Sequence, residues 1–245
     1  MNLLKNHLTV AFDLFKERRN NILANRNTQP MVIGANLPAY NMGEMENKGW
    51  ELDVNYRNNI RDLRYWARFN YSFARNKVLF KDEVQKKYAY QMETGRRVGQ
   101  FYGLLFDGYY NSWEEINALD RPVSAWNGNK LQPGDVRYVD VNKDGRIDDY
   151  DRVPIGYSPT PEIVYGFSFG ASWKGFDLSA LFQGAANVSI KYFGRSLWPF
   201  FNGKESAKSL ILERWTADRY GRGERIRFPR LSLNPNKDTD NNYKD

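Results

Sequence analysis

Five segments of this chain alternate apolar and polar residues with a period of two, and this pattern constrains the fold most. In the segment 64–75, Tyr65, Phe69 and Tyr71 fall on one side, whereas Arg64 and Arg68 fall on the other. Because alternate side chains of a strand point to opposite faces, this period predicts strands with one apolar and one polar face. The five segments are 8–16, 50–57, 64–75, 164–173 and 176–184.

The connections between these segments are of two kinds. Short turns are predicted at 58–62 and 174–177, whereas 17–49, 76–162 and the chain after 185 are long. Compact soluble domains rarely contain loops of this size, and short turns at one end with long loops at the other are typical of outer-membrane barrels. The sequence therefore predicts an all-β fold, a partial antiparallel transmembrane β-barrel of about five strands with long extracellular loops.

Composition agrees with strands rather than helices as the elements that would cross a membrane. Aromatic residues make up 16% of the chain, and they favour pleated surfaces and membrane interfaces. Trp50 and Trp173 stand at the ends of predicted strands, where an interfacial girdle is expected. No run approaches the roughly 20 apolar residues of a membrane helix. Alternation alone leaves a soluble β-sandwich open, but the turn asymmetry and the arginines of the polar face favour the barrel.

Oxygen-bearing side chains recur within 140–151 at the spacing of a calcium-binding loop. Gly145 stands at the sixth position, where such a loop turns sharply, and the seventh residue offers its backbone carbonyl. Prolines after the loop exclude the second helix of an EF-hand, so we predict a single structural calcium site. The alternative is a solvated turn that binds no ion. The predicted ligands are Asp140, Asn142, Asp144, the Arg146 carbonyl, Asp148 and Asp151.

Several stretches resemble the SusC/RagA-type TonB-dependent outer-membrane receptors, in the order that the family has them. They are 41–50 (NMGEMENKGW), 99–103 (GQFYG), 106–109 (FDGY), 133–136 (PGDV), the acidic loop 140–151, 155–156 with 159–161, and 165–184. The resemblance implies a barrel of about 22 strands closed by an N-terminal plug. It also implies a location in the Gram-negative outer membrane, contact with its lipid, a SusD-like lipoprotein as partner, and TonB-powered import of oligosaccharides or peptides.

The resemblance also sets the expected organisation of the chain. No plug, TonB box or signal peptide is recognisable within these 245 residues. We therefore expect 1–245 to be an internal fragment of the barrel, with contact to TonB made through the missing plug. The region 77–161 is expected to be a long extracellular loop region that contains the calcium loop at 140–151. The expected function is a part of an outer-membrane nutrient importer; the alternative is a soluble calcium-dependent glycan-binding β-module.

The remaining candidates are weaker. Ser112 has capping-box spacing to Glu115 and predicts a short helix. Loop tryptophans can stack on sugar rings or pack within the loops; they are Trp113, Trp126 and Trp198. His7 is the single histidine and has no catalytic motif around it, so we predict no enzyme. The arginines of 214–230 are interleaved with aromatics, as in single-strand binders, but acidic residues dilute them, and we predict no nucleic-acid partner.

Overall fold

The computed structural model describes residues 2–28, 32, 34, 37–126, 131–192 and 209–232. The chain divides into two compact units. The first unit comprises Met1–Lys86, Met92–Phe101 and Gly156–Ile190, and the second comprises Lys87–Gln91, Tyr102–Ile155 and Lys191–Asp245. Each unit is described by itself below.

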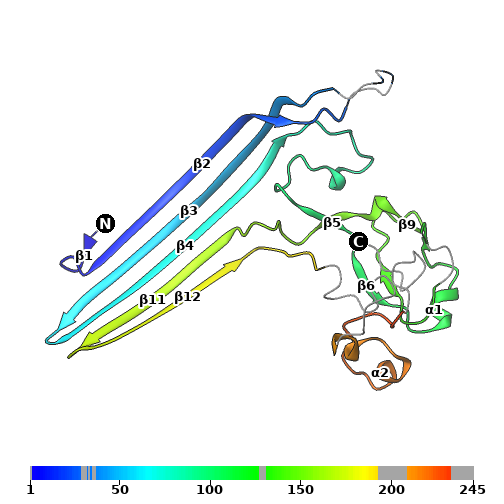
Figure 1. The fold of residues 1–245 in the computed structure, drawn as a ribbon. Helices are drawn as coiled ribbons and strands as arrows, with labels where there is room; N and C mark the ends of the chain where they lie inside the picture. Colours follow the sequence, from blue (N-terminus) through cyan, green and yellow to red (C-terminus); the bar gives the residue numbers. More distant parts are fainter. Residues whose placement is uncertain are drawn as a thin grey trace. The chain divides into compact units, whose positions relative to one another are not determined.

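The first unit is one antiparallel sheet in the order β1-β2-β3-β4-β11-β12, and Figure 1 shows its long strands side by side. The prediction of an all-β antiparallel fold is confirmed, and each of the five predicted segments lies in a strand. The strands are β1 (Asn2–Leu3), β2 (Leu8–Ala24), β3 (Tyr40–Ile60), β4 (Leu63–Phe80), β11 (Ile163–Trp173) and β12 (Phe176–Ala186).

Three of these strands are longer than their alternating segments. The prediction that 17–49 is a connection was wrong, because β2 continues to Ala24 and β3 begins at Tyr40. Likewise β4 continues to Phe80, so the connection predicted at 76–162 begins after it. In the added parts of β2 and β3, charged residues such as Arg18, Glu44 and Lys48 take the positions that are apolar further along the strand, which hides the period of two. Cross-strand ion pairs join them instead, for example Lys16 Nζ to Glu46 Oε2 at 2.9 Å.

The predicted asymmetry of the connections is present in the sheet. The loops β3–β4 and β11–β12 are two-residue turns. Lys174 and Gly175 both have positive φ, 44° and 87°, as a type I′ hairpin turn requires. At the opposite end of the strands the chain leaves the sheet after Ala24, Phe80 and Ala186, and all of the longer connections start there.

The second unit consists of short elements around two small cores. β6 (Phe106–Tyr109) pairs antiparallel with β8 (Val136–Tyr138), and β7 (Val123–Ser124) pairs parallel with β9 (Arg146–Ile147). β10 (Val153–Ile155) pairs with β5 (Phe101–Gly103). The remaining elements are η2 (Ala89–Gln91), α1 (Trp113–Asn117), η3 (Asp149–Asp151), η5 (Ser209–Glu213) and α2 (Ala217–Gly221). The cores are Leu104, Val136, Tyr138 and Ile147, and Tyr110, Ile116 and Leu131.

Two further interactions fix the segment 209–232 within the second unit. Asp135 is fully buried, and its Oδ1 accepts a hydrogen bond of 2.6 Å from Nε of Arg230. Trp215 is buried as well, and its indole N–H donates to Oδ1 of Asn111 at 3.0 Å. The predicted helix after Ser112 is confirmed, since Oγ of Ser112 accepts the N–H of Glu115 at 3.3 Å. In the described part of the chain, no helix is long and apolar enough to span a membrane.

Candidate functional site

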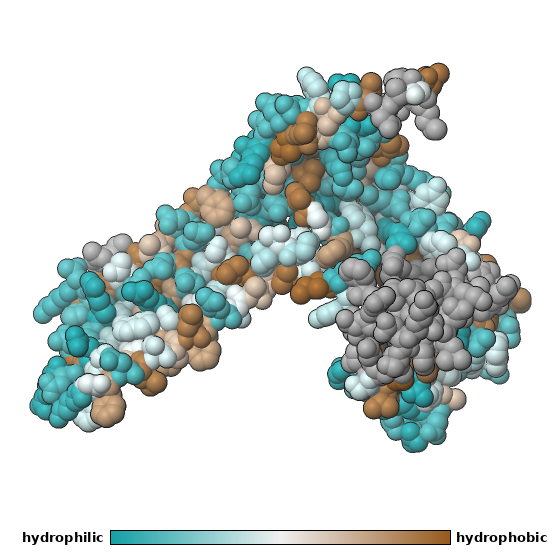
Figure 2. Space-filling model, viewed as in Figure 1, coloured by the Kyte–Doolittle hydropathy of each residue, from teal (hydrophilic) through white to brown (hydrophobic). Residues whose placement is uncertain are grey.

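The strand register brings the apolar residues of all five long strands onto one face of the sheet. One row across the sheet runs Val10–Val54–Phe69–Phe167–Phe182, and the next runs Phe12–Leu52–Tyr71–Tyr165. Figure 2 shows hydrophobic side chains, in brown, along this sheet. Many of them are exposed, including Phe12 at 56% and Leu178 at 70%. We call this surface the aromatic face.

The aromatic face has no hydrophobic layer over it among the residues that the structure describes. The buried hydrophobic residues all belong to the second unit. A soluble β-module would need the aromatic strand faces to close on each other as a core. That closure does not occur within the described ranges, so the structure lends no support to the alternative of a soluble module.

Tryptophans mark two levels of the aromatic face. Trp173 ends β11 as expected, but Trp50 lies inside β3, so the expectation of a strand end was wrong for Trp50. Trp50 pairs with Phe73, which in turn pairs with Ile163 at the other end of β11. The two tryptophans are therefore about ten residues apart along the strand direction, or about 33 Å. At a tilt of about 45° this height is about 23 Å, close to the roughly 25 Å apolar band of an outer-membrane barrel.

The opposite, polar face carries hydroxyl, amide and charged side chains. Ser168 lies opposite Arg68, and Gln183 lies opposite Gly166. Ser72 donates from Oγ to Oε1 of Glu51 at 3.1 Å, and Ser172 donates to Asp177 across the β11–β12 turn. These contacts place Ser72, Ser168, Ser172 and Gln183 together on the polar face, as the alternation predicted.

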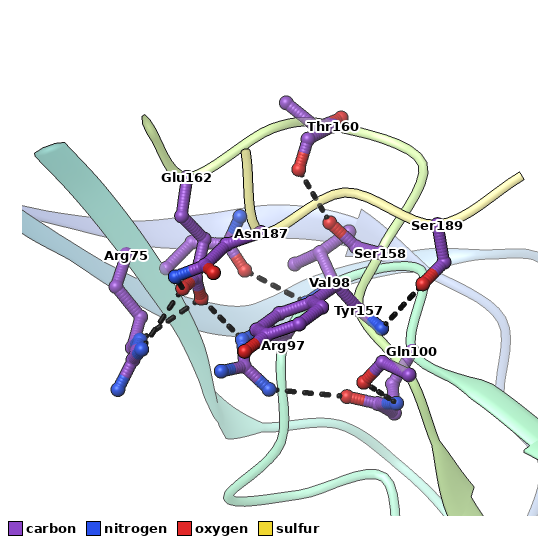
Figure 3. A network of polar contacts seen from close by, with 12 residues as sticks. Arg75, Arg97, Val98, Gln100, Tyr157, Ser158, Thr160, Glu162, Asn187 and Ser189 are labelled. Atoms are coloured by element: carbon purple, nitrogen blue, oxygen red, sulfur yellow. Dashed lines mark hydrogen bonds and ion pairs between the residues drawn. The ribbon is translucent and has the colours of Figure 1, made fainter. Parts of the chain in front are cut away.

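A buried carboxylate, Glu162, joins several segments of the first unit where β11 begins (Figure 3). Its side chain is 4% exposed. Oε2 accepts a hydrogen bond from the Arg75 guanidinium at 2.9 Å and one from Asn187 at 3.2 Å, while Oε1 is bonded by Arg75 and Arg97. The Arg97 guanidinium also lies 5.1 Å from the ring centroid of Tyr157. We call Glu162, Arg75, Arg97 and Asn187 the Glu162 cluster.

The electrostatics of the Glu162 cluster favour the ionised carboxylate. Burial by itself would raise the pKa of Glu162, but the hydrogen bonds and charges of Arg75 and Arg97 outweigh it and lower the pKa. The carboxylate is therefore charged at neutral pH, and each of its oxygens is occupied by guanidinium donors. Such a saturated carboxylate has a structural role rather than an acid–base one.

The segment next to the Glu162 cluster covers the edge of β4. The N–H of Ala74 donates to the carbonyl of Glu162 at 2.8 Å. Further along β4, Val78 exchanges two hydrogen bonds of 2.8 Å with the backbone of Gly95 and Arg96. Because unpaired strand edges invite pairing with other chains, this back-folded segment protects an edge that β11 does not reach.

The acidic loop predicted to bind calcium is closed by its own hydrogen bonds. Oδ1 of Asp140 accepts the N–H of Lys143 at 2.7 Å, and its Oδ2 accepts the N–H of Gly145 at 2.7 Å. Asn142 Oδ1 accepts the N–H of Asp144 at 2.9 Å, and its amide donates to Oδ2 of Asp144 at 3.0 Å. Gly145 has a φ of 80°, which confirms the sharp turn. Three predicted ligands, Asp140, Asn142 and Asp144, thus meet at the start of the loop.

The end of the loop is organised differently. Asp151 is fully buried; its Oδ1 accepts the N–H of Val141 at 2.9 Å and its Oδ2 accepts the N–H of Asp148 at 2.9 Å. Burial raises the pKa of Asp151 despite these hydrogen bonds. Asp148 caps η3, since its Oδ1 accepts the N–H of Tyr150 at 2.7 Å. Within the described residues, no group of three or more acidic or histidine side chains is arranged to hold a metal ion.

The residues of the loop nevertheless fit a hard cation in part. The side chains of Asp140, Asn142 and Asp144 offer oxygens on a single tight turn, and each carboxylate oxygen has more than one lone pair. Asp151 fits less well, because backbone N–H groups already use both of its oxygens. The loop also holds η2 in place: Tyr90 Oη donates to the carbonyl of Tyr150 at 2.6 Å, and Gln91 donates to that of Asp149 at 2.7 Å.

The candidate sugar-binding tryptophans have different surroundings. Trp113 is the first residue of α1 and is 55% exposed. Trp126 packs against the core of Leu104, Val136, Tyr138 and Ile147. Trp198 lies outside the described residues. Sequence reasoning did not identify Glu162 or Asp135, because their partners Arg97 and Arg230 are distant in the chain and no local spacing links them.

Comparisons with known proteins identify relatives of this chain. The chain is 27% identical over 227 residues to TonB-dependent receptor P3 of Formosa agariphila, covering 87% of this chain and 22% of that protein. It is 32% identical over 205 residues to TonB-dependent receptor P26 of the same organism, and this match covers 78% of this chain and 20% of that protein. The chain thus spans about a fifth of the length of these relatives. No family model matches the chain.

Solved structures with the same fold include two of the RagAB system. The structure of the RagAB peptide importer in its open-open state matches with a TM-score of 0.67 at 20% identity, covering 96% of this chain and 24% of that chain. The structure of the RagAB peptide transporter matches with a TM-score of 0.66 at 20% identity, and this match covers 94% of this chain and 24% of that chain. At this level of identity the match establishes the fold.

Proposed function

Because the chain is part of a TonB-dependent outer-membrane receptor of the SusC/RagA type, we propose that it builds one section of the wall of a nutrient importer. In this proposal the aromatic face meets lipid and the polar face lines the lumen. The observation that carries it is the aromatic face itself: rows of Phe, Tyr and Trp run across five strands, are exposed, and are bounded by Trp50 and Trp173 at a spacing that suits the apolar band.

The charges of the sheet agree with this orientation. Beyond the level of Trp50 the strands β2 and β3 carry charged pairs such as Arg18–Glu44, joined at 2.6 Å. Charged side chains are costly in hydrocarbon and stable in water. The extensions of β2, β3 and β4 would thus stand above the membrane on the side from which the long connections start, which in barrels of this kind is the extracellular side.

The partners and the cargo are proposed from the relatives. A SusD-like lipoprotein would cover the extracellular opening, and TonB would act through a plug that these residues do not include. The cargo would be an oligosaccharide or a peptide; the matching RagAB structures are named as a peptide importer and a peptide transporter. Exposed Trp113 offers a flat aromatic surface for such a cargo. The relatives are receptors, and we propose no enzymatic step.

We also propose that the acidic loop binds a structural calcium ion through Asp140, Asn142 and Asp144, with Asp148, Asp151 and the Arg146 carbonyl as further ligands. The loop 140–151 carries five acidic side chains against two basic ones, and a divalent cation would offset their repulsion. Since Tyr90 and Gln91 bind carbonyls of this loop, the ion would also stabilise η2.

Cysteine labelling tests the orientation of the sheet. In the receptor inserted in outer membranes, Ser168→Cys should react with a membrane-impermeant maleimide, whereas Phe169→Cys should stay unlabelled. The two positions are adjacent on β11, so depth is matched and the facing alone differs. Labelling of Phe169→Cys with protection of Ser168→Cys would reverse the assignment of lipid and lumen faces. Detergent-solubilised protein, in which both should react, is the control.

Calorimetry tests the calcium site. The double variant Asp140→Ala with Asp144→Ala should lose calcium binding and should be cut faster by protease within 140–151. Glu93→Gln is a control, because Glu93 is an exposed carboxylate outside the loop that pairs with Lys81. An unchanged calcium affinity in the double variant would remove this loop as the site, without bearing on the orientation of the sheet.

A further inference from the structure

Basic side chains continue the aromatic face directly beyond the level of Trp50, on the neighbouring strands β2, β3 and β4 (Figure 1). Leu14 pairs with Trp50, and two residues further along the same two strands Lys16 pairs with Lys48. Arg75 of β4 lies on the other side of Lys48 in the same row. The following row adds Arg18 and Lys77, which pair with Glu46 from either side. We call Lys16, Arg18, Lys48, Arg75 and Lys77 the basic belt.

Two lysines of the basic belt are held close together by one buried carboxylate. Oε2 of Glu46 lies 2.9 Å from Nζ of Lys16, and its Oε1 lies 2.7 Å from Nζ of Lys48. Glu46 is 9% exposed, whereas the side chains of Lys16 and Lys48 are 66% and 60% exposed. An ammonium group has three donors, so each lysine keeps donors for a second anion. Glu46 thus presents two ammonium groups side by side on the outer surface of the sheet.

The two ends of the aromatic face differ in charge. Within the described parts of the five long strands, the basic residues of this face all lie beyond Trp50. At the other end the face closes with the apolar row Ile60–Leu63–Trp173–Phe176, and Lys174 follows only in the turn. A membrane with two identical surfaces gives no reason for this difference. The asymmetry indicates a boundary that is rich in anions on one side only.

The depth of the basic belt follows from the strand geometry. Lys16 and Lys48 lie two residues beyond the row of Trp50, or about 7 Å along the strand. At a tilt of about 45° this distance is about 5 Å in height. The headgroup layer on each side of the hydrocarbon is about 5–7 Å thick. In the proposed orientation, the first row of the basic belt therefore lies at headgroup depth, on the side where the long connections start.

We propose that the basic belt binds the phosphate groups of lipid A, the phosphorylated glycolipid of the outer leaflet. This inference rests on the proposed orientation of the sheet. The acyl chains would pack on the aromatic face at Phe12 and Leu14, while phosphate oxygens accept hydrogen bonds from Lys16 and Lys48. Such charge-assisted hydrogen bonds are stronger than neutral ones, and lysines near an anionic surface add to one another. The receptor would thus carry a lipid bound at one height, which fixes its depth in the membrane.

Binding of lipid A to the purified receptor in nonionic detergent, measured by native mass spectrometry, tests this proposal. The matched probe is the same lipid A with its phosphates removed by phosphatase. The phosphorylated lipid should bind at least about tenfold more tightly, and added salt should reduce the difference. Equal binding of the two lipids would overturn the proposal. So would complete displacement of lipid A by an equimolar amount of inorganic phosphate, because the site would then bind a free anion.

Variants locate the binding to the basic belt. Lys48→Gln leaves the pair of Lys16 with Glu46 intact and should weaken lipid A about fivefold. The triple variant Lys16→Gln, Glu46→Gln and Lys48→Gln removes both ammonium groups without leaving a buried carboxylate unpaired. It should weaken lipid A about 25-fold. Arg19→Gln is the control, because Arg19 is on β2 close to Lys16, is 65% exposed and lies on the polar face.

Two outcomes of the variants would refute the assignment. One is full affinity in the triple variant, with its folded state confirmed by heat-modifiable migration. The other is an equal loss in Arg19→Gln and Lys48→Gln, because binding would then depend on net charge alone. The cysteine labelling of β11 separates this inference from the proposed orientation. If Ser168→Cys and Phe169→Cys label as expected and lipid A does not bind, only the role of the basic belt is wrong.

Discussion

Replacing Phe167 by arginine should destabilise the receptor in a bilayer far more than the same change on the polar face. Phe167 lies in β11 four residues from Ile163 and six from Trp173, so it is about 13 Å and 20 Å along the strand from the two ends of the apolar band. This places it close to the midplane. Arginine at the midplane of a barrel's lipid face costs about 2–4 kcal/mol, and near the interfaces about 0–1 kcal/mol.

The matched control is Gln183→Arg. Gln183 lies opposite Gly166, one residue from Phe167, so it has the same depth but belongs to the polar face. Its replacement should cost less than about 1 kcal/mol, because a lumen-facing charge remains hydrated. Trp173→Arg is a second control, since it keeps the aromatic face but moves the charge to the interface.

The assay is equilibrium unfolding of the receptor from lipid vesicles by denaturant, at several vesicle thicknesses. A cost of about 2–4 kcal/mol corresponds to a decrease of about 30- to 700-fold in the folding equilibrium constant. Thinner bilayers should reduce the penalty of Phe167→Arg and leave that of Gln183→Arg unchanged. If Gln183→Arg costs as much as Phe167→Arg, or more, the aromatic face does not meet lipid and the reasoning is refuted.

Three further predictions concern the sheet and the segments attached to it. Glu162→Gln should destabilise the receptor by about 2 kcal/mol, because Arg97 would lose a buried charged partner. Glu93→Gln, a change at an exposed carboxylate, should cost less than about 1 kcal/mol. Hydrogen exchange of the Ala74 amide measures the loss of stability in both variants. Folding lowers the pKa of Glu162. The ionised carboxylate therefore adds to the free energy of unfolding above the unfolded pKa of about 4.3, and this stabilisation is lost as pH falls through the folded pKa. Gly175→Ala should lower the stability by about 1–2 kcal/mol, because Gly175 has a positive φ. Gly221→Ala should not lower it, since no positive φ is needed there. Thermal melts of the two variants measure the difference. The 245 residues expressed alone should aggregate, because the sheet has unpaired edges and an aromatic face; a soluble monomer that melts cooperatively would contradict this.

Much of the sheet could be predicted from the sequence because its two faces differ in polarity. The period of two located the five long strands of the six-stranded sheet, and it placed residues such as Phe69 and Phe167 on one face before their pairing was known. The resemblance to SusC/RagA-type receptors and the outer-membrane location are confirmed by the similarity to known TonB-dependent receptors. Strand ends were not predictable, because charged residues replace apolar ones in the extensions of β2 and β3, and the end of β4, 78–80, is a continuous apolar run that does not alternate.

The contacts outside the regular strands depended on long-range information. Glu162 and Arg97 are 65 positions apart, and Asp135 and Arg230 are 95 apart. Neither pair has a local signature, since each carboxylate is an ordinary acidic residue next to a proline or glycine motif. The acidic loop shows the opposite case: its spacing predicted the turn at Gly145 and the meeting of Asp140 with Asn142 and Asp144, whereas the burial of Asp151 depends on the fold around it.

The edges of the sheet explain why the Glu162 cluster lies where it does. β4 runs past the first residue of β11, so from Arg75 to Phe80 its outer edge has no strand beside it. Arg75 is the first residue of that uncovered stretch, and its guanidinium holds Glu162 at the start of β11. Arg97 binds the same carboxylate from the segment whose Gly95 and Arg96 pair with Val78.

One buried carboxylate therefore fixes both the end of β11 and the segment that covers the remaining edge of β4. In the proposed orientation, loss of Glu162 would expose strand edges above the membrane, where water competes for the hydrogen bonds and other chains can pair. On this proposal the bilayer would not stabilise this part of the sheet, and its order would depend on polar contacts. The proposed orientation would account for the ion pairs beyond the level of Trp50, such as Arg18–Glu44, and for those that Arg75 and Arg97 form with Glu162 at the start of β11.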